Sequence, residues 1–208
     1  MIQYKKYILL DIYETNTYLV WDNESKEAIL IDPAAPNRDL TNEIKSLNLK
    51  LLKIINTHGH GDHIGGNEYF QKEFNCEICI HSEDAPMLVN PSLNLSALMN
   101  LDLKTPNAGE LFKDKDTFKL RENIVEIIHT PGHTKGGIVI YAAPYLFTGD
   151  TIFYLSVGRT DLPGGDTDKL VSSIKDKIFT LPKDTIILPG HGPASKVGFE
   201  IENNPYVD

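Results

Sequence analysis

Four potential metal ligands stand within six positions of this 208-residue chain, in the segment Thr57-His58-Gly59-His60-Gly61-Asp62-His63. A chance His-x-His-x-Asp-His is expected in fewer than about one in a thousand chains of this length and composition. In an extended loop His58 and His60 point to the same side and can bind one ion, whereas Asp62 and His63 turn toward a neighbouring position. The intervening glycines let the backbone fold closely around a metal. The segment therefore predicts a metal site.

Three further candidates lie far along the chain: His133 in Pro131-Gly-His133, Asp150 in Gly149-Asp150, and His191 in Gly190-His191-Gly192. Each follows a short apolar run, and functional groups in parallel α/β folds gather at the carboxyl ends of strands. Ordinary glycine turns are the alternative for each of them taken singly. Together with the first four residues they make a set of seven ligands, which suits two ions.

The remaining histidines, His81 and His129, each end a predicted strand without a partner motif, and we expect both to be structural. The two cysteines, Cys76 and Cys79, have the spacing of a redox or zinc pair. Positions i and i+3 of a strand face opposite sides, and the sequence has no second pair to complete a zinc site. We therefore expect the cysteines to belong to an ordinary strand.

The predicted elements around these residues follow the same order, strand, helix and strand, in both halves of the chain. An apolar run over residues 27–33 predicts a buried strand ending at Asp32-Pro33, residues 40–47 have helical periodicity, and residues 51–57 predict a strand running into His58. Later, an apolar run ends at Asp150, Thr167 can cap a helix, and another apolar run ends at His191. The repeat predicts an α/β fold of two similar halves, with strands at the centre and helices outside.

Residues 1–208 are expected to form a single domain, because no low-complexity linker divides them. Residues 116–120 and 123–130 alternate like antiparallel strands. Residues 83–110 contain prolines and asparagines without steady periodicity. We expect a partly helical insertion there, either a lid over a site or a surface loop.

Composition excludes several classes of partner. The chain has 29 acidic and 20 basic residues, a net charge of −9, which argues against nucleic acid or an anionic membrane surface. The longest nearly apolar run, residues 138–147, is broken by Pro144 and is shorter than the roughly 18 residues of a membrane helix. The apolar run near the start is interrupted by Asp11 before it reaches the length of a signal peptide. We expect a cytoplasmic protein.

The ordered set of seven ligands, spread over nearly the whole chain, resembles the metallo-β-lactamase superfamily and is similar to its glyoxalase II branch. The resemblance implies a four-layer αββα sandwich, which agrees with the two-half repeat. It also implies the division of ligands between two ions: His58, His60 and His133 would hold the first, Asp62, His63 and His191 the second, and Asp150 would bridge them.

Two features of the sequence differ from glyoxalase II enzymes and narrow the subgroup that the chain resembles. Glyoxalase II enzymes have a Glu-Tyr pair after the last histidine and a helical extension that helps hold glutathione, whereas this chain continues Gly192-Pro193-Ala194-Ser195. Part of the glutathione site is therefore expected to be missing. Residues 158–165 resemble both the short bacterial glyoxalase II-like hydrolases and the persulfide dioxygenases. Arg159 stands where glyoxalase II places a basic residue against a glutathione carboxylate; the alternative is an ion pair with Asp161 that shapes the loop.

The mechanism implied by the resemblance is metal-dependent hydrolysis, in which two divalent ions lower the pKa of a shared water so that a hydroxide attacks a carbonyl. Asp62 and Asp150 are the expected catalytic carboxylates, with Asp62 orienting the nucleophile and accepting its proton. Asp32 is a candidate partner for a ligand histidine, although a purely structural Asp-Pro turn is the favoured interpretation.

Three functions remain open on the sequence alone. The leading one is hydrolysis of a small-molecule thioester such as a hydroxyacylglutathione, the second is an iron-dependent persulfide dioxygenase, and the third is a metal-binding protein without catalysis. Five histidines and two aspartates accept Zn, Fe or Mn, and zinc is the expected metal. The sequence does not indicate the oligomeric state.

Overall fold

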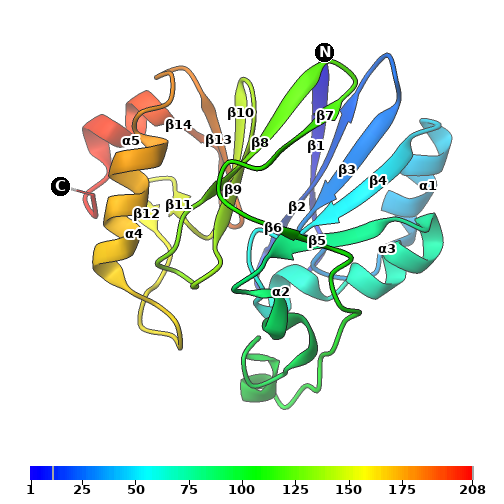
Figure 1. The fold of residues 1–208 in the computed structure, drawn as a ribbon, viewed down its shortest axis with the longest axis horizontal. Helices are drawn as coiled ribbons and strands as arrows, with labels where there is room; N and C mark the ends of the chain where they lie inside the picture. The colour runs from blue at the N-terminus through cyan, green and yellow to red at the C-terminus, as the bar shows by residue number, and fades with distance from the viewer. Residues whose placement is uncertain (11, 208) are drawn as a thin grey trace.

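The computed structural model describes residues 1–10 and 12–207, and it contains two six-stranded sheets that face each other (Figure 1). The first sheet has the order β1 (Ile2–Ile8), β2 (Asn16–Asp22), β3 (Glu27–Ile31), β4 (Lys50–Ile55), β5 (Glu77–His81) and β6 (Glu110–Phe112). The second has the order β14 (Ser195–Lys196), β13 (Ile186–Pro189), β10 (Tyr145–Gly149), β9 (Ile138–Ala142), β8 (Asn123–His129) and β7 (Thr117–Leu120). A small ribbon pairs β11 (Ile152–Phe153) with β12 (Ser156–Val157).

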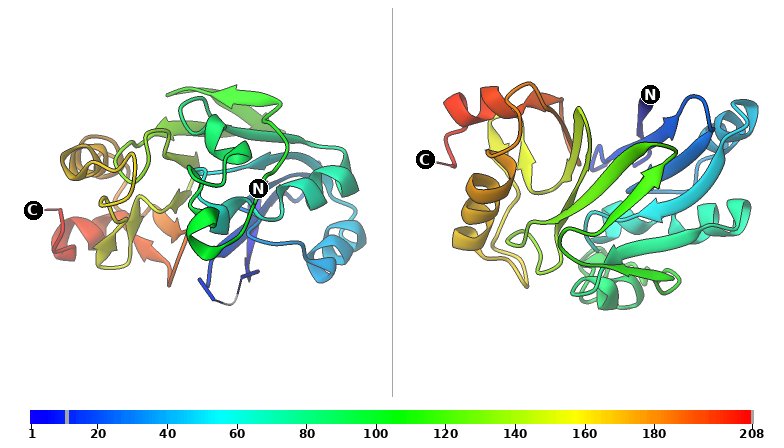
Figure 2. Two further views of the ribbon diagram at one scale, coloured as in Figure 1. Left: turned by 90° about the horizontal axis from the view of Figure 1, so that it is seen from below. Right: turned by 45° about the horizontal axis from the view of Figure 1, so that its top comes forward.

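Helices cover the outer faces of both sheets (Figures 1 and 2). On the first sheet lie α1 (Arg38–Ser46) and α3 (Asn67–Phe74), and on the second lie α4 (Thr167–Ser173), its π-helical continuation (Ile174–Ile178) and α5 (Val197–Asn203). The short α2 (Gly61–Ile64) follows β4. The result is the predicted α/β sandwich of four layers. None of the helices described is long and apolar enough to cross a membrane.

Three apolar clusters fill the spaces between the four layers. The middle cluster joins the inner faces of the two sheets, and the outer clusters pack each sheet against its helices. Along β3, Ile29 and Ile31 belong to the middle cluster, while Ala28 and Leu30 belong to an outer one. Successive side chains of a strand point to opposite faces, so a strand buried on both sides is a continuous apolar run. This is why the central strands were recognisable in the sequence.

The two cysteines follow the same rule. Cys76 lies in the outer cluster of the first sheet, Cys79 lies in the middle cluster, and both are free. Cys79 lies in β5 and Cys76 directly precedes it, and the two side chains pack on opposite sides of the sheet, as the strand interpretation predicts.

The predicted elements are present with small shifts. The helix expected over residues 40–47 is α1, which begins after Asn37, whose Oδ1 accepts the backbone N–H of Leu40 at 2.8 Å. The cap expected at Thr167 is wrong by one residue. Asp166 has extended backbone and its carboxylate accepts the Lys169 N–H at 3.1 Å, which is the geometry of an N-cap.

The parallel strands direct several loops to one edge of the sandwich. β3 pairs in parallel with β4, and β10 pairs in parallel with β13, so the carboxyl ends within each pair lie together. Beside this edge, residues 83–110 contain two short 3₁₀ helices, Ala85–Val89 and Ser96–Met99, in the lower part of Figure 1.

Candidate metal centre

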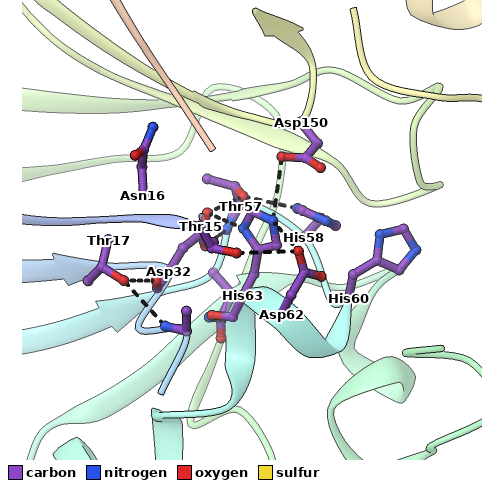
Figure 3. A network of polar contacts seen from close by, with 12 residues as sticks. Thr15, Asn16, Thr17, Asp32, Thr57, His58, His60, Asp62, His63 and Asp150 are labelled. Atoms are coloured by element: carbon purple, nitrogen blue, oxygen red, sulfur yellow. Dashed lines mark hydrogen bonds and ion pairs between the residues drawn. The ribbon is translucent and has the colours of Figure 1, made fainter. Parts of the chain in front are cut away.

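The seven candidate ligands come together at this edge from both sheets. His58 and His60 follow β4, and Asp62 and His63 lie in α2. The other three follow strands of the second sheet: His133 after β8, Asp150 after β10, and His191 after β13. Figure 3 shows the side chains from the first sheet beside Asp150.

The first group consists of His58, His60 and His133, each of which offers a ligand atom within 4.8 Å of the others. The Nδ1 atom of His60 lies 3.0 Å from Nε2 of His133. Two nitrogens bound tetrahedrally to one zinc ion at about 2.0–2.1 Å are themselves about 3.3 Å apart. The pair is therefore close to the separation that one shared ion requires.

The second group consists of Asp62, His63 and His191. The Nε2 atoms of the two histidines are 3.3 Å apart, and Oδ2 of Asp62 is 3.4 Å from each of them. These three nearly equal distances describe one triangular face of a coordination tetrahedron.

Asp150 lies between the two groups. Its Oδ1 is 3.4 Å from Nε2 of His63, while its Oδ2 is 3.5 Å from Nε2 of His191 and 3.7 Å from Nε2 of His133. One carboxylate thus faces ligand atoms of both groups, as a bridging ligand must.

Unpartnered buried atoms provide an independent test of whether metal ions fit. Within the described part of the chain, Nε2 of His58 and Oδ1 of Asp150 are buried without a hydrogen-bond partner. A buried polar atom left without a partner costs about 1–3 kcal/mol, and an ion is one accepted explanation for it. The donor set and its spacing therefore fit divalent metal ions.

The electrostatics differ between the two groups. Burial and the neighbouring His133 lower the pKa of His60 to about 3. Burial alone would lower the pKa of His63 too, but the Asp62 and Asp150 carboxylates outweigh it and raise that pKa to about 9. Hydrogen bonds to the same carboxylates likewise outweigh burial at His191 and raise its pKa to about 10. In the metal-free protein, protons therefore balance the carboxylate charge that bound cations would otherwise neutralise.

The Asp32 carboxylate contacts a histidine of the second ligand group. Its Oδ1 accepts the Thr57 N–H at 2.7 Å, and its Oδ2 accepts the Thr57 hydroxyl at 2.6 Å and lies 3.0 Å from Nδ1 of His63 (Figure 3). A carboxylate at Nδ1 places the ring proton there and leaves Nε2 free for an ion. The interpretation of Asp32 as only a turn residue is therefore wrong, because its side chain contacts a candidate ligand.

Two other histidines are oriented by backbone carbonyls. Nδ1 of His133 lies 2.7 Å from the carbonyl oxygen of Arg159, and Nδ1 of His191 lies 2.8 Å from that of Tyr13. These contacts fix which ring nitrogen faces the site. Sequence reasoning missed them, since every residue carries a carbonyl and no side-chain type marks this role.

Asp84 is a side chain that sequence reasoning missed. It is 1% exposed and accepts hydrogen bonds from Gly59 N at 3.2 Å, Thr134 Oγ1 at 2.7 Å and Gly136 N at 2.7 Å. It therefore ties the loop that carries His58 and His60 to the loop that follows His133. No motif surrounds it, because it stands at the start of the aperiodic segment 83–110.

Arg159 forms the ion pair that was the alternative to a substrate contact, and it also lies at the candidate site. Its Nε and Nη2 atoms donate to the two carboxylate oxygens of Asp161 at 2.7 and 2.8 Å, so the ion pair is present. The same arginine also lines a cavity of about 510 Å³ with His60, His133 and Asp150. The rest of this metal-site cavity is mainly apolar, with Tyr13, Leu95, Leu98, Phe153, Val157 and Leu162 in its wall.

His81 and His129 are partners of each other rather than isolated. Their rings stack 4.0 Å apart at an interplanar angle of 10°, beside Glu83. Nε2 of His129 also lies 2.8 Å from the carbonyl oxygen of Lys135. His81, Glu83 and His129 offer ligand atoms within 4.8 Å of one another. The parallel planes of the stacked rings do not converge on one point, which favours the expected structural role, and that role stays a prediction. The sequence could not show the pairing across two strands.

A sandwich of two mixed sheets with a buried histidine and aspartate cluster at its strand ends defines a class of metal-dependent hydrolases. The chain belongs to the metallo-beta-lactamase superfamily, whose family profile matches residues 10–191. Members of this superfamily bind divalent metals, and the cluster described above is able to hold them.

Individual proteins and solved structures are similar to this chain over nearly its whole length. The hydroxyacylglutathione hydrolase GloC of Haemophilus influenzae is 36% identical over 202 residues, which cover 94% of each chain. The crystal structure of BLEG-1, described as a B3 metallo-beta-lactamase, matches with a TM-score of 0.93 and 34% identity over 99% of both chains. TTHA1623 in a di-iron-bound form matches with a TM-score of 0.82 and 28% identity, covering 97% of this chain and 99% of that one.

Proposed function

We propose that this metallo-hydrolase cleaves thioesters, adding water across the acyl–sulfur bond to give a carboxylic acid and a thiol. His58, His60 and His133 would hold one ion and Asp62, His63 and His191 a second. Zinc is the proposed metal, and iron suits the same donors. The observation that carries the proposal is Asp150, whose carboxylate faces both ligand groups at 3.4–3.7 Å.

Each group at the site would have a separate role in the proposed reaction. Paired divalent ions would supply Lewis acidity and lower the pKa of a bound water. Asp62 is ionised at neutral pH, because His63 and His191 outweigh its burial and lower its pKa, so its carboxylate can accept a proton from the attacking water. Arg159 would contact an anionic group on the substrate. A thiolate leaves without prior protonation, so the reaction needs no general acid.

The similarity to GloC supports a glutathione thioester as the first substrate to test. The protein is loaded with zinc or with iron, its metal content is measured, and S-lactoylglutathione and simpler thioesters are offered with and without air. We expect cleavage at equal rates under both atmospheres and activity of the zinc form. A chromogenic β-lactam serves as a further substrate, because one structural neighbour is described as a β-lactamase.

Two outcomes would overturn the proposal. Iron-dependent oxygen uptake matched to loss of glutathione persulfide, with negligible thioester cleavage, would establish the dioxygenase instead. Tight metal binding without turnover of any thioester, ester or β-lactam would favour a protein that binds metal without catalysis.

A further inference from the structure

A second cavity of about 620 Å³ adjoins the metal site and is not used by the reaction described above. The loop between β1 and β2 forms one wall, and the segment after the second 3₁₀ helix forms the other. Its lining includes Leu10, Ile12, Tyr13, Leu101, Asp102 and Leu103. We call it the side pocket.

The side pocket adjoins the metal-site cavity. Tyr13, Gly61 and Asp62 line both of them. Because Asp62 is one of the candidate ligands, a substrate whose carbonyl lies at the ions can extend past it into the side pocket. Arg159 lines only the metal-site cavity, so the two cavities offer different chemistry to the two ends of a thioester.

The walls of the side pocket are aliphatic, and some of them are left uncovered. Ile12 is 84% exposed and Leu101 is 55% exposed, although large aliphatic side chains are stabilised by burial. A ligand chain lying between them would remove this apolar surface from water.

The charges of the described residues that line the side pocket disfavour an anion. Among the described residues that line it there is no lysine or arginine, while two carboxylates, Asp62 and Asp102, are present. Asp102 is paired with Lys104 at 2.9 Å, and that ammonium is therefore already engaged. Asp62 would face a metal ion in the loaded protein. Among the described residues that line the pocket, an acidic acyl group would therefore meet Asp102 and no unpaired cation, at an electrostatic cost.

We propose that the side pocket binds the acyl portion of the substrate and selects uncharged, apolar acyl chains longer than a lactoyl group. The inference rests on the proposed thioesterase function and specifies its substrate class. The cavity has the size of pockets that hold ligands of drug-like dimensions, about 300–1,000 Å³, whereas a lactoyl group adds only two carbons beyond the carbonyl. The thiol portion would lie toward Arg159.

The test compares glutathione thioesters that share one thiol and differ in the acyl group: lactoyl, butanoyl, hexanoyl and succinyl. Each fully buried methylene strengthens binding by up to about fourfold. We expect kcat/KM to rise from butanoyl to hexanoyl by about tenfold, with the lactoyl and succinyl compounds at least tenfold below hexanoyl.

Substitutions in the side pocket test whether the preference for longer acyl chains arises there. Ile12→Ser combined with Leu101→Ser should lower kcat/KM for the hexanoyl compound about tenfold and change that for the lactoyl compound less than twofold. Leu101→Lys should raise the succinyl rate, because it places a cation in the pocket. Ile124→Ser is the control, since Ile124 is a 60% exposed aliphatic residue on β8 that lines neither cavity. It should leave all four rates unchanged.

A binding measurement keeps this inference separate from catalysis. The dissociation constants of S-hexylglutathione and S-methylglutathione are measured by calorimetry on the metal-loaded protein. We expect the hexyl compound to bind at least tenfold more tightly, and the double serine variant to abolish the difference. Equal affinities, or a lactoyl kcat/KM equal to the hexanoyl one, would overturn the inference. Failure to cleave any thioester while the hexyl preference persists would refute the proposed function and leave the pocket assignment standing.

Discussion

Replacement of Asp32 by asparagine should weaken the second metal site more than the first. Asparagine has the same shape and tolerates the left-handed backbone found here, where φ is 48°. The amide oxygen can still accept the Thr57 N–H, but an NH₂ group now replaces the oxygen that lies 3.0 Å from Nδ1 of His63. Two donors would face each other, so the His63 ring would move its proton to Nε2, the atom that points at the ion.

The expected magnitude follows from the loss of one orienting hydrogen bond. Removing such a partner of a ligand histidine costs about 10- to 100-fold in metal affinity, which corresponds to about 1.4–2.7 kcal/mol. The larger effect should fall on the site of Asp62, His63 and His191, because Asp32 contacts His63 directly at 3.0 Å. It reaches His58 of the first group only through the Thr57 hydroxyl, which lies 3.1 Å from Nδ1 of His58.

The assay is competition for zinc with a chromophoric chelator, followed for both binding steps. Asp22→Asn is the matched control. Asp22 is also buried and accepts two backbone N–H groups, from Glu24 at 3.0 Å and Ser25 at 2.9 Å, but it lies at the far end of β2, about 20 Å along the strand from Asn16. It should lower the melting temperature without changing metal affinity. Two unaltered binding steps in the Asp32 variant, or equal weakening of both, would refute the reasoning.

Four other predictions concern the same site. His191→Ala should reduce the metal content to about one ion per chain, whereas His129→Ala should retain two; two ions with full activity in the first variant would contradict the ligand assignment. In the metal-free protein, the raised pKa values of His63 and His191 stabilise the fold fully below pH 6.5, and this contribution should disappear as the pH rises through 9 to 10. Since ligand imidazoles must be neutral, metal affinity should strengthen over the same range by up to about tenfold per pH unit for each proton displaced, and an affinity independent of pH would contradict this. Arg159→Met should raise KM for an acidic thioester about tenfold more than for a neutral one, while equal changes would leave Arg159 only its ion pair with Asp161.

Much of the fold and of the candidate site could be predicted from the sequence, because the central strands and the candidate ligands are defined by side-chain type. Strands such as β3 and β10 are apolar on both faces and appear as uninterrupted runs. His58, His60 and Asp62 stand close together in one loop, since a single turn of chain must present several donors. The helix cap shifted from Thr167 to Asp166, because both residues can cap and only the backbone conformation decides between them.

The tertiary structure alone decided which groups orient the ligands and what surrounds them. Asp84 reaches Thr134 across fifty positions, and the carbonyl of Tyr13 reaches His191 across 178. Loops far apart in the sequence form the side pocket, with Ile12 on one wall and Leu101 on the other. Donor chemistry is a property of residue type, so the sequence was enough to predict the candidate ligand set. Carbonyl contacts and pocket walls depend on where the folded chain brings ordinary residues, so only the packing of the two sheets determined them.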